Sequence, residues 1–353
     1  MAKERLFNLP ETKGTYQLRG IVSGTSSDRF YKNSKTSTGK DMRSVSFGVE
    51  VENGKTLYVE MQAFPREEVF FYKRGENGQK GTVEKVKWAN RHNFNKEGYR
   101  LIGVNVGLNK VVDQNGNMKN DNKTMVEFDA CDLIGKTLND GMSVFVKGGI
   151  DFSSFLNNDG SIRRMTKFIP NQISLCKTDI NFEDEKFEAQ HDFNQTIVFM
   201  GIEQEKEDDK PTGRFIVSAK IVTYSTIEDT TFVITNPKLA TNFKKNLKPY
   251  MAINVWGKID ATTITEDVES DDDGWGEANP MKKVSSQTRR ELIITGAEKE
   301  SIDATIYTKE EMENAMIKIK NAQNAQKDFA DDSSSGWGDP SSLSSEDDEE
   351  EGW

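Results

Sequence analysis

The sequence predicts an all-β-dominated protein in which two five-stranded units follow one another, ahead of a C-terminal helix and a disordered acidic tail. Apolar and polar residues alternate with period two in ten short segments, which is the pattern of half-buried strands. These segments occur in the same order twice. Residues 328–353 then contain ten Asp or Glu and no Lys or Arg, which is typical of a solvated tail.

The first unit is predicted to have five strands, at residues 14–24, 43–51, 55–64, 142–152 and 163–177. The second and third are joined by Asn53-Gly54, a dipeptide typical of a hairpin turn. A long insertion of about residues 73–135 separates the third from the fourth. A turn at Asn158-Asp159-Gly160 is expected between the last two.

The second unit is more compact, with strands predicted at residues 195–206, 214–225, 228–235, 250–260 and 289–300. A helix is expected at 236–247, because Asn236 suits the N-cap and Pro237 the first helical position. Strand, strand, strand, helix, strand, strand is the order of the OB fold, a five-stranded Greek-key barrel. The sequence therefore predicts two tandem OB-fold-like barrels, with a generic antiparallel sandwich as the alternative.

These patterns place the first domain at residues 1–178 and the second at 194–302, with an acidic linker at 179–193. Beyond them, Thr308 and Glu311 have the spacing of a capping box, which predicts an amphipathic helix at 308–329. Its apolar side is made of Met312, Ala315, Met316 and Ile319. We expect this side to pack on a barrel rather than to mediate self-association. Residues 330–353 have no periodicity and are expected to be disordered.

Charge is unevenly distributed along the chain. Residues 1–180 carry 28 Lys or Arg against 21 Asp or Glu, whereas residues 181–353 carry 19 against 37. The excess of basic residues in the first half of the chain favours a polyanionic partner. No apolar run is long enough to span a membrane and the start lacks the apolar region of a signal peptide, so a cytoplasmic protein is expected.

Little in the sequence favours catalysis. The only histidines, His92 and His191, are far apart, and no Walker A, GxSxG or HExxH pattern is present. The two cysteines, Cys131 and Cys176, form no metal-ligand pattern. The acidic segment at 266–277 could bind a divalent cation, but its spacing does not fit an EF-hand and a solvated loop is favoured. We expect no enzyme activity, no cofactor and no metal.

Basic and aromatic residues are interleaved in the first unit. A single nucleic acid strand exposes base faces and phosphates, so a protein that binds it needs flat rings and cations. The candidate contacts for single-stranded DNA are Arg19, Arg29, Phe30, Tyr31, Lys32, Lys35, Lys40, Arg43, Tyr58, Phe64, Lys87, Trp88, Arg91, Phe94, Arg163, Arg164 and Lys167.

The reasons differ between the parts of this set. The loop at 26–43 is expected to be one flexible basic segment. Tyr58 and Phe64 have the parity opposite to the apolar positions of their strand, whereas Phe47 is expected in the core. Trp88 and Phe94 could close over a groove or pack beneath the insertion, and neither reading is preferred. Arg163, Arg164 and Lys167 favour phosphate contact, with a solvated, protected edge as the alternative. The second unit is a weaker candidate because Asp271, Asp272 and Asp273 would repel phosphates.

With these patterns in place, the chain resembles the single-stranded DNA-binding proteins of bacteria and their phages. The ending "EDDEEEGW" is similar to the acidic, aromatic-ended tail of those families, but it lacks their usual proline and phenylalanine, which favours a phage type. The resemblance implies a protein that protects single-stranded DNA in replication, recombination or repair, in the host cytoplasm if phage-encoded. It also implies recruitment of partner proteins through Asp347, Asp348, Glu349, Glu350, Glu351 and Trp353.

Two further points concern this tail and the whole function. Gly-Trp-Gly occurs twice, at 274–276 and 336–338, each time in acidic surroundings. The carboxylates resemble a phosphate backbone and are expected to compete for the basic surface at low salt. A protein-interaction scaffold is the alternative function. The sequence leaves open DNA against RNA, the number of nucleotides bound and the oligomeric state.

Overall fold

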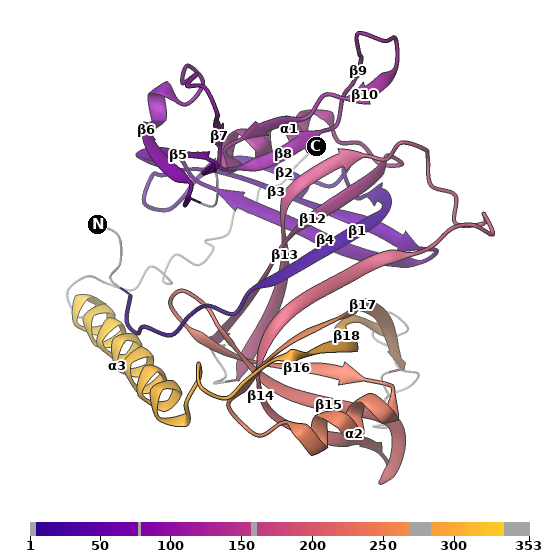
Figure 1. The fold of residues 1–353 in the computed structure, drawn as a ribbon, viewed down its shortest axis with the longest axis vertical. Helices are drawn as coiled ribbons and strands as arrows, with labels where there is room; N and C mark the ends of the chain where they lie inside the picture. The colour runs from indigo at the N-terminus through magenta and orange to yellow at the C-terminus, as the bar shows by residue number, and fades with distance from the viewer. Residues whose placement is uncertain (1–4, 77–78, 157–160, 268–283, 335–353) are drawn as a thin grey trace, which may run out of the picture.

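The computed structural model describes residues 5–76, 79–156, 161–267 and 284–334, and strands dominate this part of the chain (Figure 1). The first half contains β1 (Gly14–Ser23), β2 (Tyr31–Lys35), β3 (Asp41–Glu52), β4 (Lys55–Ala63), β5 (Glu68–Lys73), β6 (Thr82–Lys87), η1 (Trp88–Asn90), β7 (Tyr99–Leu101), β8 (Val104–Gly107), β9 (Lys110–Val112), β10 (Met118–Asn120), β11 (Lys123–Met125), α1 (Glu127–Thr137), β12 (Ser143–Leu156) and β13 (Ile162–Leu175). The second half contains β14 (Gln190–Glu207), β15 (Lys210–Val222), β16 (Ile227–Ile234), α2 (Pro237–Asn246), β17 (Met251–Asp267), β18 (Val284–Asp303) and α3 (Lys309–Ser334).

Five strands of the first half pair in a closed circuit, which we call the first ring: β1, β3, β4, β13 and β12. β1 pairs with β3, β3 with β4, β4 with β13, β13 with β12, and β12 again with β1. All of these pairings are antiparallel except the one between β4 and β13, which is parallel at Val59 and Phe168. Each of the ten predicted strand segments overlaps an observed strand, and seven of them extend one to three residues beyond it.

The second ring repeats this arrangement with β14, β15, β16, β18 and β17. Its single parallel contact, Val233 with Ile293, again joins the third strand to the fifth. A helix stands between the third and fourth strands of each ring, α1 in the first and α2 in the second. In α2 the Asn236 side chain accepts from the backbone N–H groups of Lys238 and Leu239, as the sequence predicts. Helix α1 lies inside the insertion and was not expected.

Two glycines permit a sharp bend at the same place in each ring. In β12 the register shifts at Gly148, where a Cβ atom would lie 1.8 Å from the carbonyl oxygen of Ile169. In β17 the register shifts at Gly257, and a Cβ atom would lie 1.8 Å from the carbonyl oxygen of Ile293. Only glycine allows such a close approach of neighbouring backbones. β12 and β17 are each the fourth strand of their ring, so the two rings share the position of this glycine as well as the order of their strands.

The two rings belong to one continuous sheet. β1 pairs with β14 from Gly14 opposite Gln195 to Arg19 opposite Gln190. One hydrophobic cluster runs through both rings, and Tyr16 and Phe193, which are register partners across this junction, are each about 2% exposed. The predicted linker is therefore partly strand, because β14 begins at Gln190. His191, expected in a solvated linker, is buried there and contacts the Ile259 carbonyl oxygen through Nδ1 at 2.6 Å.

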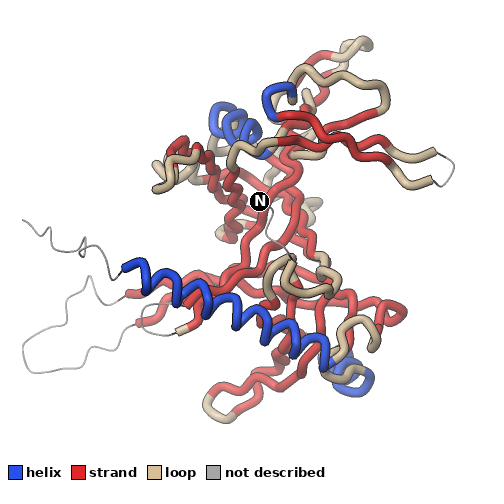
Figure 2. Tube along the Cα trace, turned by 90° about the vertical axis from the view of Figure 1, so that its left-hand side faces the viewer, coloured by secondary structure: helices blue, strands red, loops and turns tan. Residues whose placement is uncertain are grey.

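The remaining segments cover the ends of the molecule. The insertion, together with β5 just before it, forms a separate three-stranded sheet, β6-β5-β7, at the upper left of Figure 1, and it also contains a small β9–β10 hairpin. Helix α3 crosses the outside of the molecule at the other end (Figure 2). There Met312 and Ala315 pack with Phe7 and Leu9 of the N-terminal segment. Thr308 caps this helix as predicted: its Oγ1 accepts from the Glu311 N–H and donates to Glu311 Oε2 at 2.7 Å.

Candidate nucleic-acid interface

Two aromatic side chains are exposed on the outer face of β4, as its alternation predicts. Leu57, Val59 and Met61 point into the first ring and are at most 3% exposed. Tyr58 is 47% exposed, and Phe64, just beyond the end of the strand, is 36% exposed. Phe47 is buried, also as predicted. The outer face of the first ring of strands therefore presents two flat aromatic side chains to solvent.

Arg290 of β18 lies beside Tyr58, with its guanidinium carbon 5.6 Å from the ring centre. The sequence-based interpretation missed this residue because it treated the second unit as a weaker candidate. Tyr58 and Arg290 are far apart in the sequence. The only sequence feature that pointed to Arg290 was the Arg289-Arg290 dipeptide at the start of the predicted strand at 289–300. A guanidinium beside an aromatic ring supplies both groups that a single strand requires.

Arg290 and Arg164 line a cavity of about 400 Å³ on the second ring, which we call the arginine cavity. Thr166 joins Arg164 from β13, and the other walls come from β14, β15, β16 and β18. A neighbouring cavity of about 300 Å³ shares Thr231, Arg290 and Leu292 with it. The surface around Tyr58 thus continues from one ring onto the other.

Lysines neutralise two carboxylates near this surface. Asp229, in the wall of the arginine cavity, is paired with Lys220 at 2.5 Å between Oδ1 and Nζ. Glu60, two residues from Tyr58, is paired with Lys167 at 3.3 Å. Burial raises the pKa of Asp151, and the nearby Glu228 and Glu60 carboxylates raise it further, although Lys167 opposes them. Lys167 therefore lies beside carboxylates, whose negative charge offsets its positive charge.

The basic loop of the first ring is a hairpin rather than a flexible segment. β2 pairs with β3 from Tyr31 opposite Val45 to Lys35 opposite Asp41. Arg29, Lys32, Lys35 and Lys40 are exposed along it. Lys35 Nζ lies 3.6 Å from the Asp41 carboxylate, and both side chains are largely exposed, so this ion pair is weak.

The other side chains of this loop are turned inward. Phe30, predicted as a stacking ring, is only 6% exposed and belongs to the core, because the loop folds back on β3. Tyr31 is half-buried and donates a hydrogen bond to Asp132 of α1 at 3.0 Å, and burial is the main reason that its pKa is raised. Arg43 lies over the Phe128 ring, 4.1 Å from its centre. These contacts tie the hairpin to α1.

In the insertion, the predicted rings pack beneath the small sheet rather than face solvent. Phe94 contacts the buried Phe71 with ring centres 4.3 Å apart. Trp88 is half-buried under the guanidinium of Arg91, which makes two hydrogen bonds to Asp129 at 2.8 and 3.1 Å. Of the candidates here, only Lys87 is exposed. The packing alternative is therefore the observed arrangement for Trp88 and Phe94.

The remaining candidates lie along the first ring. Arg163 and Arg164 are exposed in the β12–β13 hairpin, where Arg163 lies over Phe155, 5.9 Å from the ring centre. Phe155 is itself 44% exposed. Arg19 is half-buried, and its guanidinium lies 5.7 Å from the Phe187 ring centre. The hairpin therefore adds a further exposed ring and two cations close to the arginine cavity.

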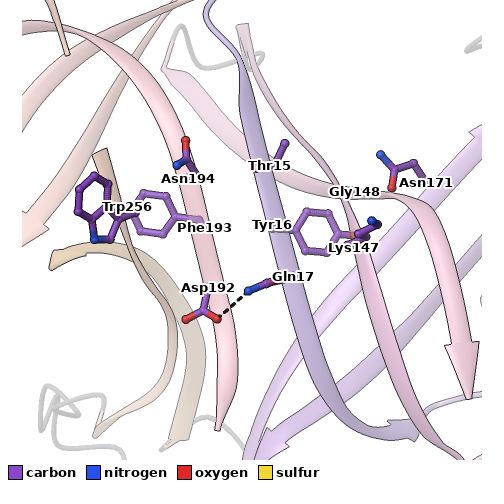
Figure 3. Close-up of a pocket in the computed structure, with 10 residues that line it drawn as sticks. All are labelled: Thr15, Tyr16, Gln17, Lys147, Gly148, Asn171, Asp192, Phe193, Asn194 and Trp256. Atoms are coloured by element: carbon purple, nitrogen blue, oxygen red, sulfur yellow. Dashed lines mark hydrogen bonds between the residues drawn. The ribbon is translucent and has the colours of Figure 1, made fainter. Parts of the chain in front are cut away.

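A third cavity, of about 480 Å³, lies where β1, β12, β14 and β17 meet (Figure 3). Figure 3 shows Trp256 at one side of it and the amide of Asn171 at the other. Trp256 is 42% exposed and lies against the backbone at Gly296, where a Cβ atom would be 2.5 Å from the indole nitrogen. Gln17 donates to Asp192 at 3.1 Å on the floor. The alternation in the segment 253–259 places Trp256 outward, but the sequence-based interpretation did not use it.

Other predictions bear on groups away from this surface. Within the described residues, no cluster of His, Cys, Asp or Glu is placed to hold a metal ion. The tail residues Asp347, Asp348, Glu349, Glu350, Glu351 and Trp353, the turn at 158–160 and, of the acidic segment at 266–277, all but its first two residues lie outside the described residues. None of the helices in the described part of the chain combines the length and apolarity that crossing a bilayer requires.

Comparison with known proteins places the sequence in a family. The profile of the YorF family matches residues 73–332, which is most of the chain. The chain belongs to the YorF family. The matched part of this YorF protein runs from the end of β5 into α3, so it includes most of the insertion and the whole second ring. No curated protein matches the sequence.

Two solved structures have a weak similarity to this YorF protein. One is the wild-type single-stranded DNA-binding protein of Thermus aquaticus, with 7% identity and a TM-score of 0.38 over 82% of this chain and 93% of that one. The other is a deletion mutant of the same protein, with 10% identity and a TM-score of 0.38 over 82% and 94%. These TM-scores are too low to assign a fold or a function.

Proposed function

We propose that this protein binds single-stranded DNA with little preference for sequence. The observation that carries the proposal is the exposed Tyr58 ring with the Arg290 guanidinium beside it, next to the arginine cavity. A ring accepts any base by stacking and a guanidinium attracts the phosphates, and neither group reads a base edge.

The strand order supports this choice of surface. The two rings have the order of the OB fold, and we propose that they are tandem OB barrels, with domains at residues 1–178 and 194–302. In that fold the second and third strands form the face that binds oligonucleotides. These strands are β3 and β4 in the first ring, and β4 carries Tyr58. The loop between the first two strands contributes as well, and here it is the β2 hairpin with its exposed lysines.

The exposed cations would contact the backbone at both ends of this face. Lys32, Lys35 and Lys40 lie on the β2 hairpin, and Arg163 and Arg164 lie on the β12–β13 hairpin. Each phosphate contact releases counterions, which makes the affinity fall with salt. Phe30, Trp88 and Phe94 take no part in this proposal, because Phe30 is buried and the half-buried Trp88 and Phe94 pack against the core of the small sheet.

The biological role follows from the tail and the charge asymmetry of the sequence. We infer a non-enzymatic, cytoplasmic protein, encoded by a phage, that protects single strands in replication, recombination or repair. The acidic residues 346–351 together with Trp353 would bind partner proteins, with the Trp353 ring as an apolar anchor and the carboxylates steering association.

Titration of the full chain with poly-dT and with a duplex of equal length tests the proposal. We expect tight binding to poly-dT, a decrease of affinity with salt of about 0.7 log units per phosphate contact and decade of salt, and much weaker binding to duplex. Poly-U in parallel decides between DNA and RNA. No binding to poly-dT at low salt would refute the function and favour the protein-interaction scaffold, and magnesium-dependent cleavage of labelled DNA would show an enzyme instead.

A further inference from the structure

The insertion sheet has two different faces. Its inner face carries Val69, Phe71 and Val86, which are at most 9% exposed and form a small core with Val126 at the start of α1. Trp88, Phe94 and Tyr99 pack against this core. The aromatic residues that the sequence suggested for binding therefore hold the sheet on the first ring. The outer face consists of other residues.

Register determines which side chains share the outer face. On the central strand β5, Phe70 and Tyr72 alternate with the buried Val69 and Phe71, so they point outward. Tyr72 lies opposite Val83 of β6 and opposite Arg100 of β7. Phe70 lies opposite Lys85, whose Nζ is 5.8 Å from the Phe70 ring centre. Cross-strand partners point to the same side of a sheet, so rings and cations are neighbours here.

This face is exposed and positively charged. Tyr72 is 42% exposed and its partner Val83 is 56% exposed. Lys85, Lys87 and Arg100 are also exposed, and the strand residue Glu68 is the carboxylate beside them, 3.7 Å from Lys85. That ion pair is largely in solvent and weak. Three cations against one carboxylate favour an anionic partner.

The Tyr72 ring lies against Gly81. A Cβ atom at Gly81 would lie 2.3 to 2.4 Å from the Tyr72 hydroxyl and ring atoms, so one side of the ring lies against this glycine. The exposed part of the Tyr72 side chain is available to a stacking partner.

We propose that this outer face, Phe70 and Tyr72 with Lys85, Lys87 and Arg100, is a second binding platform for the same single strand. Two rings spaced by about 6.6 Å along one strand of a small antiparallel sheet, flanked by cations, suit the stacking of neighbouring unpaired bases. The inference rests on the proposed function and adds a contact to it. The single-stranded DNA reaches this platform only when it is long enough to extend beyond the face that carries Tyr58.

The test compares Tyr72→Ala with the matched control Val83→Ala, which removes an exposed side chain from the same row without removing a ring. Binding is measured by fluorescence anisotropy with a short dT oligonucleotide of about 8 nucleotides, within the range of one OB fold, and a long one of about 35. We expect Tyr72→Ala to weaken long-oligonucleotide binding about fivefold or more, the lower limit for loss of one stacked base, and to leave short-oligonucleotide binding unchanged. Val83→Ala should change neither.

A second measurement does not depend on affinity. Ultraviolet cross-linking of the wild-type chain to a long oligonucleotide containing 4-thiothymidine, followed by peptide mass spectrometry, should label Phe70 or Tyr72. Normal long-oligonucleotide affinity of Tyr72→Ala, with no cross-link in β5, would overturn the platform while binding to the Tyr58 face persists. Absence of binding to both oligonucleotides would instead refute the proposed function, so the two failures are distinguishable.

Discussion

Replacement of Tyr58 by alanine tests the proposed interface with little risk to the fold. The ring is 47% exposed, so about half of its surface is already in water and the buried half rests on the outside of the sheet. Loss of one stacked base is worth about 1–3 kcal/mol, which corresponds to a Kd for short dT oligonucleotides about 5- to 150-fold higher. The melting temperature should change little. The control is Tyr224→Ala, because Tyr224 is 51% exposed and has the Arg5 guanidinium 5.6 Å from its ring centre.

A double-mutant cycle with Arg290→Gln sharpens this test. Because the two side chains are in contact and each helps to position the other, their effects on the free energy of binding should not be additive. Arg290→Gln alone should also reduce the slope of log K against log salt by about 0.7, the loss of one phosphate contact. Binding is measured by anisotropy at several salt concentrations. Equal affinities for Tyr58→Ala and Tyr224→Ala would refute the reasoning.

Three further predictions concern other parts of the chain. Asp151→Asn should raise the melting temperature at pH 7 and have less effect near pH 4. Burial raises the folded-state pKa of the Asp151 carboxyl, so its ionisation destabilises the fold once the pH rises above the pKa of the unfolded chain. A lower melting temperature of the variant at pH 7 would show that attraction between Asp151 and Lys167 dominates. Burial raises the pKa of the Cys131 thiol to about 12, so at pH 8 a thiol reagent should modify it only after denaturation, and rapid modification of the native chain would contradict this. Deletion of residues 331–353 should tighten binding to a short oligonucleotide at low salt and have little effect at high salt, and unchanged affinity at low salt would argue against competition by the tail.

The strands and caps were predictable because their causes are local. Alternation in residues 55–64 identified both the buried row of β4 and the exposed Tyr58. Asn236 and Thr308 were identified as caps because capping depends on a few neighbouring positions. The repeated order of elements predicted the strands of both rings, since each strand carries its own pattern.

The candidate site was less predictable because it depends on contacts between distant residues. Phe30 lies in a polar, basic segment, and only the pairing of β2 with β3 shows that it is buried. The proximity of Arg290 to Tyr58 follows from how the two rings sit together, which no local pattern encodes. Phe70 and Tyr72 lie just before the expected insertion, in a six-residue strand that gave too few positions to decide which aromatic residues face inward, so they were passed over.

The pairing of β1 with β14 determines how the two rings can act together. Domains joined by a flexible tether bind a polymer with an effective concentration that depends on the length of the tether. Here backbone hydrogen bonds from Gly14–Arg19 to Gln190–Gln195 hold the rings at a constant mutual angle. On the proposed function, the length of DNA that the protein covers is then set by the geometry of the sheet, and lengthening the chain between β13 and β14 should leave it the same.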